Sequence, residues 1–250
     1  MPSLCRQSLL EIYGYFANNY NYLSFWSLNL TRIEAYTFEG FDNLQYLYFH
    51  GNQLNYIDAN AFKGLAHLYY LDLSNNQLKT LDGSIFSNLT SLYYLDLSLN
   101  SLVYLSNDTF KGLLNLNYLY LQNNQLKTLN GSIFSNLTRL YYLDLSSNSL
   151  DYLSCDLFKG LSSLQNLYLQ NNQLTTLEEY IIFNLTLLKK IYLNSNKFDD
   201  ESKSGLINSF SIINNVDTVY IYIDKNALYY TLSNVQTLCG NNTKCYISCK

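Results

Sequence analysis

The chain has 250 residues, a formal net charge of −4 at pH 7 and only 14% charged residues. It contains no cluster of Lys and Arg that would form a surface for nucleic acid or anionic membranes. No run of about 18 uninterrupted apolar residues occurs, so we expect no transmembrane segment. The unusual feature is the content of 26 tyrosines, whose positions bear on function.

Residues 1–19 precede the first copy of a repeating pattern and match none of it. Stacked repeats leave an open apolar edge, so we expect these residues to form an N-terminal cap. The segment contains a short apolar run, with no basic stretch before it and no small-residue cleavage site after it. It therefore lacks the pattern of a signal peptide.

From residue 20 onward the pattern LxxLxLxxNxLxxLxxxxFxxLxx recurs every 24 residues, and its copy at residues 68–91 is complete. The copies begin at Leu44, Leu68, Leu92, Leu116, Leu140 and Leu164, and more loosely at Tyr20 and Leu188. The pattern resembles the leucine-rich repeat signature.

The first six positions of each copy alternate as a strand does, so Leu71 and Leu73 face one way and Asp72 and Ser74 the other. One unit cannot bury its apolar face alone, whereas stacked copies share a continuous core. We therefore predict an α/β solenoid, a right-handed arc with a parallel concave sheet of about 8–9 strands. Its convex side is predicted to be mostly irregular or 3-10, with one short helix near the C-terminus.

Two columns of the pattern have predicted structural roles. The Asn at the ninth position is expected to be buried and to bind backbone groups where each strand leaves the sheet. The Phe column is expected to fill the convex side. The Asn column comprises Asn52, Asn76, Asn100, Asn124, Asn148, Asn172 and Asn196. The Phe column comprises Phe38, Phe62, Phe86, Phe110, Phe134 and Phe158, and Ile182 takes its place in the following unit.

The repeat frame divides the chain into three parts. Residues 1–19 form the N-terminal cap, 20–224 the solenoid and 225–250 a C-terminal cap containing cysteines. Within the solenoid we distinguish a degenerate first repeat (20–43), six regular repeats (44–187), a longer last repeat (188–215) and a final strand (216–224, centred on 218–223). In the last repeat, Asp199 or Asp200 is expected to cap the short helix.

Three of the five cysteines, Cys239, Cys245 and Cys249, lie near the C-terminus. A disulfide among them is the favoured interpretation, with Cys239 paired to Cys249 or to Cys245. A zinc site needs four ligands at set spacing and no His lies near the three, so we expect no zinc site here. We expect no other metal and no cofactor. Cys5 and Cys155 are interpreted as lone thiols.

The repeats resemble the extracellular, "typical" 24-residue class found in Toll-like receptors, Slit-like proteins, small proteoglycans and variable lymphocyte receptors. The resemblance is based on the sequence segments NNQLKTL and IFSNLTSLYYLDLS. It implies a non-catalytic, protein-binding ectodomain of receptor, adhesion or immune type, or a fragment of one, at the cell surface or secreted. The caps usual in that class, with four N-terminal cysteines and an Asn-Pro-Trp-like turn, are not matched. The alternative is therefore a cytoplasmic leucine-rich repeat scaffold or regulatory subunit.

Tyrosine concentrates at the outward strand positions of the predicted concave face. Strand propensity and lateral stacking explain part of this, and a binding surface is the competing interpretation. The predicted partner-binding residues are Tyr46, Tyr48, Tyr70, Asp72, Tyr94, Asp96, Tyr118, Tyr120, Tyr142, Asp144 and Tyr168. Tyr69, Tyr93 and Tyr141 add to the same face. Because the set includes acidic groups and no basic ones, we expect a protein partner carrying Lys or Arg.

Two other groups of residues on this face allow a different interpretation. His50 lies beside Ser74 on the next strand, with Asp72 two residues before it, but no strained turn or oxyanion hole accompanies them, so we expect no enzyme. Asp72 and Asp96 stack on neighbouring strands, with Asp144 two strands further on, either to attract a cation or basic partner or simply as solvated acids.

Seven sequons for N-glycosylation occur: Asn29, Asn88, Asn107, Asn130, Asn136, Asn184 and Asn241. Three of them, Asn88, Asn136 and Asn184, fall at one repeat position away from the concave face. This arrangement is compatible with glycosylation, although repeat copying explains it equally well.

Overall fold

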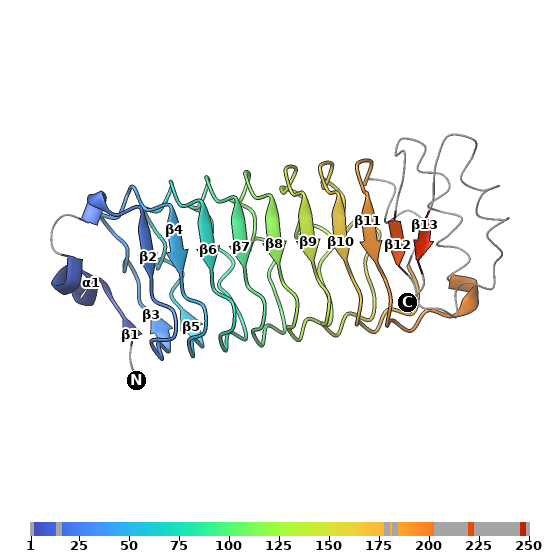
Figure 1. The fold of residues 1–250 in the computed structure, drawn as a ribbon, viewed down its shortest axis with the longest axis horizontal. Coiled ribbons are helices and arrows are strands. Elements are labelled where there is room, and N and C mark those ends of the chain that lie inside the picture. The colour runs from blue at the N-terminus through green and yellow to red at the C-terminus, as the bar shows by residue number, and fades with distance from the viewer. Residues whose placement is uncertain are drawn as a thin grey trace.

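The computed structural model describes residues 3–13, 17–177, 181, 185–202, 220–222 and 246–248. Over these residues the chain winds into an elongated solenoid, with one strand of each turn on a shared face (Figure 1). This arrangement confirms the predicted repeat solenoid with a parallel concave sheet and very little helix.

The concave sheet has ten parallel strands in the described part of the chain. They are β2 (Tyr22–Ser24), β4 (Tyr46–Tyr48), β6 (Tyr70–Asp72), β7 (Tyr94–Asp96), β8 (Tyr118–Tyr120), β9 (Tyr142–Asp144), β10 (Asn166–Tyr168), β11 (Lys190–Tyr192), β12 (Tyr220–Tyr222) and β13 (Tyr246–Ser248). Neighbours from β2 to β11 pair in the register of the repeat, so that Tyr70 lies opposite Tyr94 and Leu71 opposite Leu95. The eight strands from β2 to β11 match the predicted sheet. β12 falls inside the predicted final strand, whereas β13 extends the sheet in a segment assigned only to a cap.

The core is a set of stacked columns contributed by successive turns. Leu71 and Leu95 are fully buried, as are the Phe residues of the convex side. Neighbouring Phe rings from Phe38 to Phe134 stack with centroids 6.0–6.5 Å apart. Burial of each such ring contributes about 1.5–3 kcal/mol to stability. Position 182, where the column was expected to continue with Ile, lies outside the described residues.

The Asn column joins each turn to the one before it. Asn76 donates from Nδ2 to the carbonyls of Phe49 (3.0 Å) and Leu73 (3.1 Å), and its Oδ1 accepts from the backbone N–H of Leu54 at 3.0 Å. The same bonds recur at Asn100, Asn124, Asn148, Asn172 and Asn196. The predicted role is therefore confirmed, because each amide satisfies backbone groups of two turns at once.

A further column, at the eighth position, takes the left-handed backbone conformation in each of the eight turns from β2 to β11. Its members are Ser27, Gly51, Asn75, Leu99, Asn123, Ser147, Asn171 and Ser195, with φ between 52° and 70°. Gly, Asn and small residues tolerate this conformation, whereas a bulky side chain is strained in it. Leu99 is the exception, and its side chain is 50% exposed.

The convex side consists mainly of turns, with one small sheet that the repeat pattern does not predict. Three short parallel strands form it in the order β1 (Ser3–Leu4), β3 (Arg32–Ile33) and β5 (Tyr56–Ile57). The N-terminal segment thus joins the first turns directly, and the backbone N–H of Glu34 donates to the carbonyl of Leu4 at 2.9 Å.

The N-terminal segment also contains helix α1 (Arg6–Tyr13) and the 3-10 helix η1 (Ala17–Asn19). Leu9 on α1 is fully buried. The Tyr13 ring packs edge-on against Tyr20 and Phe41, with centroids 5.0 Å and 6.3 Å apart. These contacts cover apolar surface of the first turn.

At the other end, residues 200–202 are helical and Asp199 caps them. Its Oδ1 accepts from the backbone N–H of Ser202 at 2.8 Å, as an N-cap does. The remainder of the predicted helix lies outside the described residues, as do Cys239, Cys245 and Cys249. Cys5 and Cys155 are unpaired thiols, and Cys155 is exposed.

Candidate functional site

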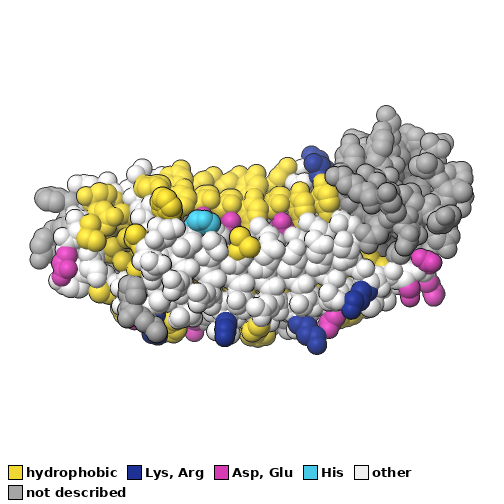
Figure 2. Space-filling model, turned by 60° about the horizontal axis from the view of Figure 1, so that its bottom comes forward, with side chains coloured by type: hydrophobic (Ala, Val, Ile, Leu, Met, Phe, Trp, Pro, Cys, Tyr) yellow, Lys and Arg dark blue, Asp and Glu magenta, His cyan; other side chains and the backbone are white. Residues whose placement is uncertain are grey.

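The structure brings all eleven predicted partner-binding residues onto the concave sheet, on strands β4 and β6 to β10. They occupy the outward positions of these strands, and all except Asp144 are half-buried. Figure 2 shows hydrophobic side chains, tyrosines included, gathered in a band along the solenoid, with acidic side chains beside it.

The tyrosines are not independent columns but form two continuous ladders across the sheet. The inner ladder comprises Tyr22, Tyr48, Tyr70, Tyr94, Tyr120, Tyr142, Tyr168 and Tyr192, with successive ring centroids 4.2–5.2 Å apart. The outer ladder comprises Tyr46, Tyr69, Tyr93, Tyr118 and Tyr141, with successive centroids 4.7–6.2 Å apart.

A simple rule in the sequence builds both ladders. Where the fifth position of a unit is Tyr, as at Tyr120, that ring joins the inner ladder and the third-position Tyr118 joins the outer one. Where the fifth position is Asp, as at Asp96, the third-position Tyr94 moves into the inner ladder. The second-position Tyr93 then takes the outer place. The sequence predicted Tyr69, Tyr93 and Tyr141 only as additions to the binding face. In the structure these second-position tyrosines form the outer ladder together with Tyr46 and Tyr118.

Stacking decides which part of each ring a ligand can reach. Tyr70 and Tyr94 stack with centroids 4.2 Å apart and planes inclined by 9°. Between these two tyrosines the ring faces are therefore turned to each other, and the ring edges and hydroxyls are left for a partner. The rings of Tyr94, Tyr120, Tyr142 and Tyr168 are tilted by 34–38° from one to the next. A basic group could therefore not stack between Tyr70 and Tyr94, whereas stacking on the other rings stays a prediction.

Burial raises the pKa of several tyrosines in the middle of the inner ladder. Burial raises the pKa of Tyr70 from 10.0 to about 12. Burial also raises the pKa of Tyr94 and of Tyr142, with nearby acidic groups adding to the effect. At physiological pH these three tyrosines are neutral phenols that can donate and accept hydrogen bonds.

The three acids of this face have a structural role that sequence reasoning did not assign. The Oδ1 atoms of Asp72, Asp96 and Asp144 accept the backbone N–H two residues ahead, at 2.8–2.9 Å. Asp144 is only 8% exposed, so the interpretation as a solvated acid is wrong for it. Burial raises the pKa of Asp96 and of Asp144 above the usual range.

The Ser-His-Asp grouping does not have the geometry of a catalytic triad. His50 Nδ1 lies 2.9 Å from Ser74 Oγ, as the adjacency in sequence suggested. However, Asp72 hydrogen-bonds the backbone N–H of Ser74 rather than the imidazole, and Ser74 is only 5% exposed. A triad needs the carboxylate to orient the histidine, so these three residues do not form one.

Five of the seven sequons fall within the described residues, and the side chains of their asparagines (Asn29, Asn88, Asn107, Asn130 and Asn136) are all exposed. They lie outside the concave strands. Asn184 and Asn241 are outside the described residues. Over the described ranges, no group of three or more His, Cys, Asp or Glu could hold a metal ion. Nor does any described helix have the length and apolar character to cross a membrane.

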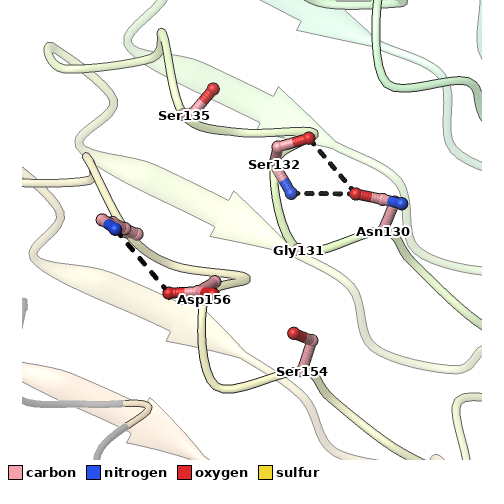
Figure 3. Close-up of a pocket in the computed structure, with 7 residues that line it drawn as sticks. Asn130, Gly131, Ser132, Ser135, Ser154 and Asp156 are labelled. Carbon is pink, nitrogen blue, oxygen red and sulfur yellow. Dashed lines mark hydrogen bonds and ion pairs between the residues drawn. The ribbon is translucent and has the colours of Figure 1, made fainter.

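A polar furrow of about 560 Å³ lies in the turns after β8 and β9. Figure 3 shows its wall, formed by Asn130, Ser132, Ser135, Ser154 and Asp156, with the close approach of two turns at Gly131. The residues that line the furrow lie outside the concave strands, and the sequon at Asn130 is the only feature among them that the sequence pointed to.

The family model for the leucine rich repeat matches residues 19–78, 66–126, 91–150, 114–174 and 138–198, which together cover most of the chain. A search of curated proteins found no match.

Proposed function

The chain belongs to the leucine-rich repeat family, whose members are generally non-enzymatic protein-interaction scaffolds, and we propose that it binds a protein partner through its concave face. The observation that carries this proposal is the continuity of the inner ladder from Tyr22 to Tyr192. Tyrosine supplies a large contact area at low entropic cost and a hydroxyl that orients the partner, and it is enriched in protein-binding surfaces.

The proposed partner carries Lys or Arg where it meets the N-terminal half of this face. Asp72 and Asp96 lie directly opposite each other on β6 and β7 and are only half-buried. None of the strands from β4 to β10 carries a basic residue. An approaching ammonium or guanidinium group can pair with these carboxylates and donate hydrogen bonds to the neighbouring phenol oxygens, instead of stacking on a ring.

The setting proposed for this binding is extracellular, as part of a receptor, adhesion or immune-type ectodomain. The exposed sequon asparagines, all away from the concave strands, support it. An intracellular scaffold or regulatory subunit is the second candidate. It is favoured by the unpaired, exposed thiol of Cys155, because reduced thiols are typical of the cytosol.

Expression behind a secretory leader separates the two settings. We expect a secreted, monodisperse product whose mass falls on treatment with an N-glycosidase. A product retained in the cell, aggregated and unglycosylated would favour the intracellular setting.

Photo-crosslinking tests the binding face itself. A photoreactive residue is placed at Tyr118 on the concave face or, as a matched control, at Tyr104 on the convex side, which is 58% exposed. Each protein is then irradiated with extracts of the source organism. We expect one discrete crosslinked protein from position 118 and none from position 104. Equal crosslinking from both positions would argue against the concave site.

A further inference from the structure

We propose that Tyr22, Trp26 and Leu28, at the N-terminal end of the concave face, anchor a large apolar side chain of the protein partner, on an extended segment that carries Lys or Arg four residues away. This inference rests on the proposed binding at the concave face and adds the position and register of the bound segment. The three anchor side chains are 54%, 63% and 55% exposed. Hydrophobic side chains gather at this end of the molecule (Figure 2).

Trp26 lies on the concave face although it follows the end of β2. The backbone N–H of Phe25 donates to the carbonyl of Tyr48 at 2.8 Å. The N–H of Ser27 donates to the carbonyl of His50 at 3.1 Å, so the pairing of the first two turns continues past the strand. Side chains alternate along such a paired segment. Phe25 is therefore buried in the core, and Trp26 points outward.

Neither the repeat nor the tyrosine ladders account for this tryptophan. Trp26 occupies the seventh position of the first turn and belongs to neither ladder. The same position is polar in the seven turns that follow: His50, Ser74, Ser98, Gln122, Ser146, Gln170 and Asn194. Exposed apolar side chains that gather in one patch mark interaction sites, and Trp is enriched among the residues that anchor protein partners.

Leu28 is exposed because the first turn has no repeat before it. In later turns the ninth residue is a buried Asn that donates to the preceding turn, as Asn52 does to the carbonyl of Phe25 at 2.7 Å. Leu28 takes this position in the first turn, and its backbone N–H donates to Asn52 Oδ1 at 3.0 Å. The backbone is thus fixed while the apolar side chain stays outside the core, two residues from Trp26.

Tyr22 is the first ring of the inner ladder. Among the described rings of that ladder it has one neighbour, Tyr48, at 5.2 Å and inclined by 44°. Its strand β2 is the last in the sheet order, so the other side of the ring faces the end of the sheet. More of this ring is therefore open to a ligand than of Tyr70 or Tyr94, which are half-buried between neighbours.

Acidic groups lie on the strands two and three places away from β2. Asp72 on β6 and Asp96 on β7 each use Oδ1 to accept the N–H two residues ahead, so Oδ2 is available to a partner. His50 follows Trp26 in the seventh-position column, and its Nδ1 lies 2.9 Å from Ser74 Oγ. Its ring is thus held toward the third turn, away from the indole.

The spacing of the two groups sets the register of the bound segment. Neighbouring strands lie about 4.7–4.9 Å apart, so Asp72 and Asp96 lie roughly 10 and 14 Å from β2 across the sheet. In an extended segment, side chains four residues apart share a face and lie about 13 Å apart. An apolar side chain seated on Trp26 therefore brings a Lys or Arg over these carboxylates, where charge-assisted hydrogen bonds form.

The test selects binders to the full chain from a display library of random twelve-residue peptides that lack tryptophan. We expect the enriched peptides to carry a large apolar residue four positions from Lys or Arg. Trp26 is the one tryptophan of the chain, so its fluorescence reports on the anchor itself. A bound apolar side chain should shift its emission to shorter wavelength.

Variants of the anchor are compared by calorimetric titration with one selected peptide. Trp26→Ala should weaken binding at least about tenfold, since Trp is a typical anchor of binding energy. Leu28→Ser, the second variant, should weaken it by a smaller factor. Both side chains are exposed, so neither change should alter the melting temperature. Tyr104→Ala, which removes an equally exposed aromatic ring on the convex side, is the control and should leave affinity unchanged.

The charge of the site is tested separately. Asp72→Asn combined with Asp96→Asn keeps an acceptor for the N–H two residues ahead and removes both charges. It should weaken binding about tenfold and abolish the dependence of affinity on salt. Asp108→Asn combined with Asp156→Asn makes the same change in net charge at two exposed acids outside the concave strands, and should have no effect.

The register is tested by changing the peptide. Replacing its apolar residue by Ala should weaken binding to the parent about tenfold and cause no further loss on the Trp26→Ala protein, because both changes remove the same contact. Inserting one Gly between the apolar and the basic residue turns them to opposite faces and should also weaken binding about tenfold.

The outcomes separate this inference from the proposed function. Peptides that bind both anchor variants as tightly as the parent, but fail to bind Tyr94→Ala combined with Tyr118→Ala, would overturn the anchor and leave the concave site intact. A selection that returns no peptide with the apolar–basic pair, or binding that ignores the charge of the two aspartates, would also overturn it. Peptides that bind every variant alike would count against both proposals.

Discussion

The rings of Tyr70 and Tyr94, 24 residues apart in the chain, stack with centroids 4.2 Å apart. Neighbouring strands of a sheet lie about 4.7–4.9 Å apart, so the sheet itself brings the rings into contact. The contact removes ring surface from water, and burial accordingly raises the pKa of both phenols. One geometric fact thus determines both the surface offered to a partner and its response to pH.

We predict that the protein loses stability at alkaline pH as the inner ladder is forced to ionise. The pKa of Tyr70 is raised from 10.0 to about 12 in the folded chain, so the unfolded chain releases this proton first. The contribution of this group is complete below pH 10.0 and is lost as pH rises through about 12. Urea unfolding across this range measures it. Tyr70→Phe should flatten the fall, and identical profiles for the two proteins would contradict the prediction.

Asp144→Asn should make the protein more stable at pH 7 than the parent. Burial raises the pKa of Asp144, so the charged form is disfavoured in the folded state. The parent keeps its full stability below the ordinary pKa and loses part of it as pH rises through the raised value. An Asn can still accept the N–H of Ser146, which Asp144 now binds at 2.9 Å. Unfolding curves at about pH 3 and pH 7 should show a difference between the two proteins that appears only at the higher pH.

Leu99→Asn should stabilise the protein by about 1 kcal/mol, because a bulky residue in the left-handed region costs about 1–2 kcal/mol. Leu99 has a φ of 54°, whereas the neighbouring turns carry Asn75 and Asn123 at the same position. The expected rise in melting temperature is about 2–4 °C. The reverse change, Asn123→Leu, should lower it. A Leu99→Asn protein that melts lower would show that Leu99 makes contacts that compensate its backbone strain.

Asn124→Ala should destabilise the solenoid by about 3 kcal/mol or more, because it leaves several buried backbone groups without partners. Asn124 accepts from the N–H of Leu102 at 2.9 Å and donates to the carbonyls of Leu97 and Leu121, both at 3.0 Å. Gln125→Ala, at the exposed neighbouring position, is the control and should change stability little. Equal losses of unfolding free energy from the two changes would mean that the buried hydrogen bonds of the Asn column do not stabilise the fold.

The repeat frame predicts most of this fold because every copy must bury the same positions. Leu71, Asn76 and Phe86 are buried where the pattern places them, and the frame also sets the register of the sheet. Helix α1 and strand β13 lie outside the regular copies, so no periodic pattern could predict them.

The candidate site was predictable only in part. The alternation of a strand places Tyr70 and Tyr120 on the concave face, but it assigns them to different positions of the repeat. Both nevertheless belong to the inner ladder, because each side chain leans to fill the place that its neighbours leave open. Likewise, the sequence predicts a solvated side chain for Asp144. Its burial depends on Tyr120 and Tyr168, which lie opposite it on the adjacent strands.

The concave face should carry the binding energy for the proposed partner. Tyr94→Ala combined with Tyr118→Ala opens both ladders at the middle of the arc, and we expect it to weaken binding at least about tenfold, since buried Tyr anchors typically contribute about 2 kcal/mol or more. The control pair, Tyr104→Ala with Tyr152→Ala, removes two tyrosines that are 58% and 50% exposed on the convex side, and should leave affinity unchanged. Calorimetric titration and thermal melting are measured together on each protein. A concave pair that lowers the melting temperature sharply, or a convex pair that weakens binding more, would show that the ladders serve the fold and that the partner binds elsewhere.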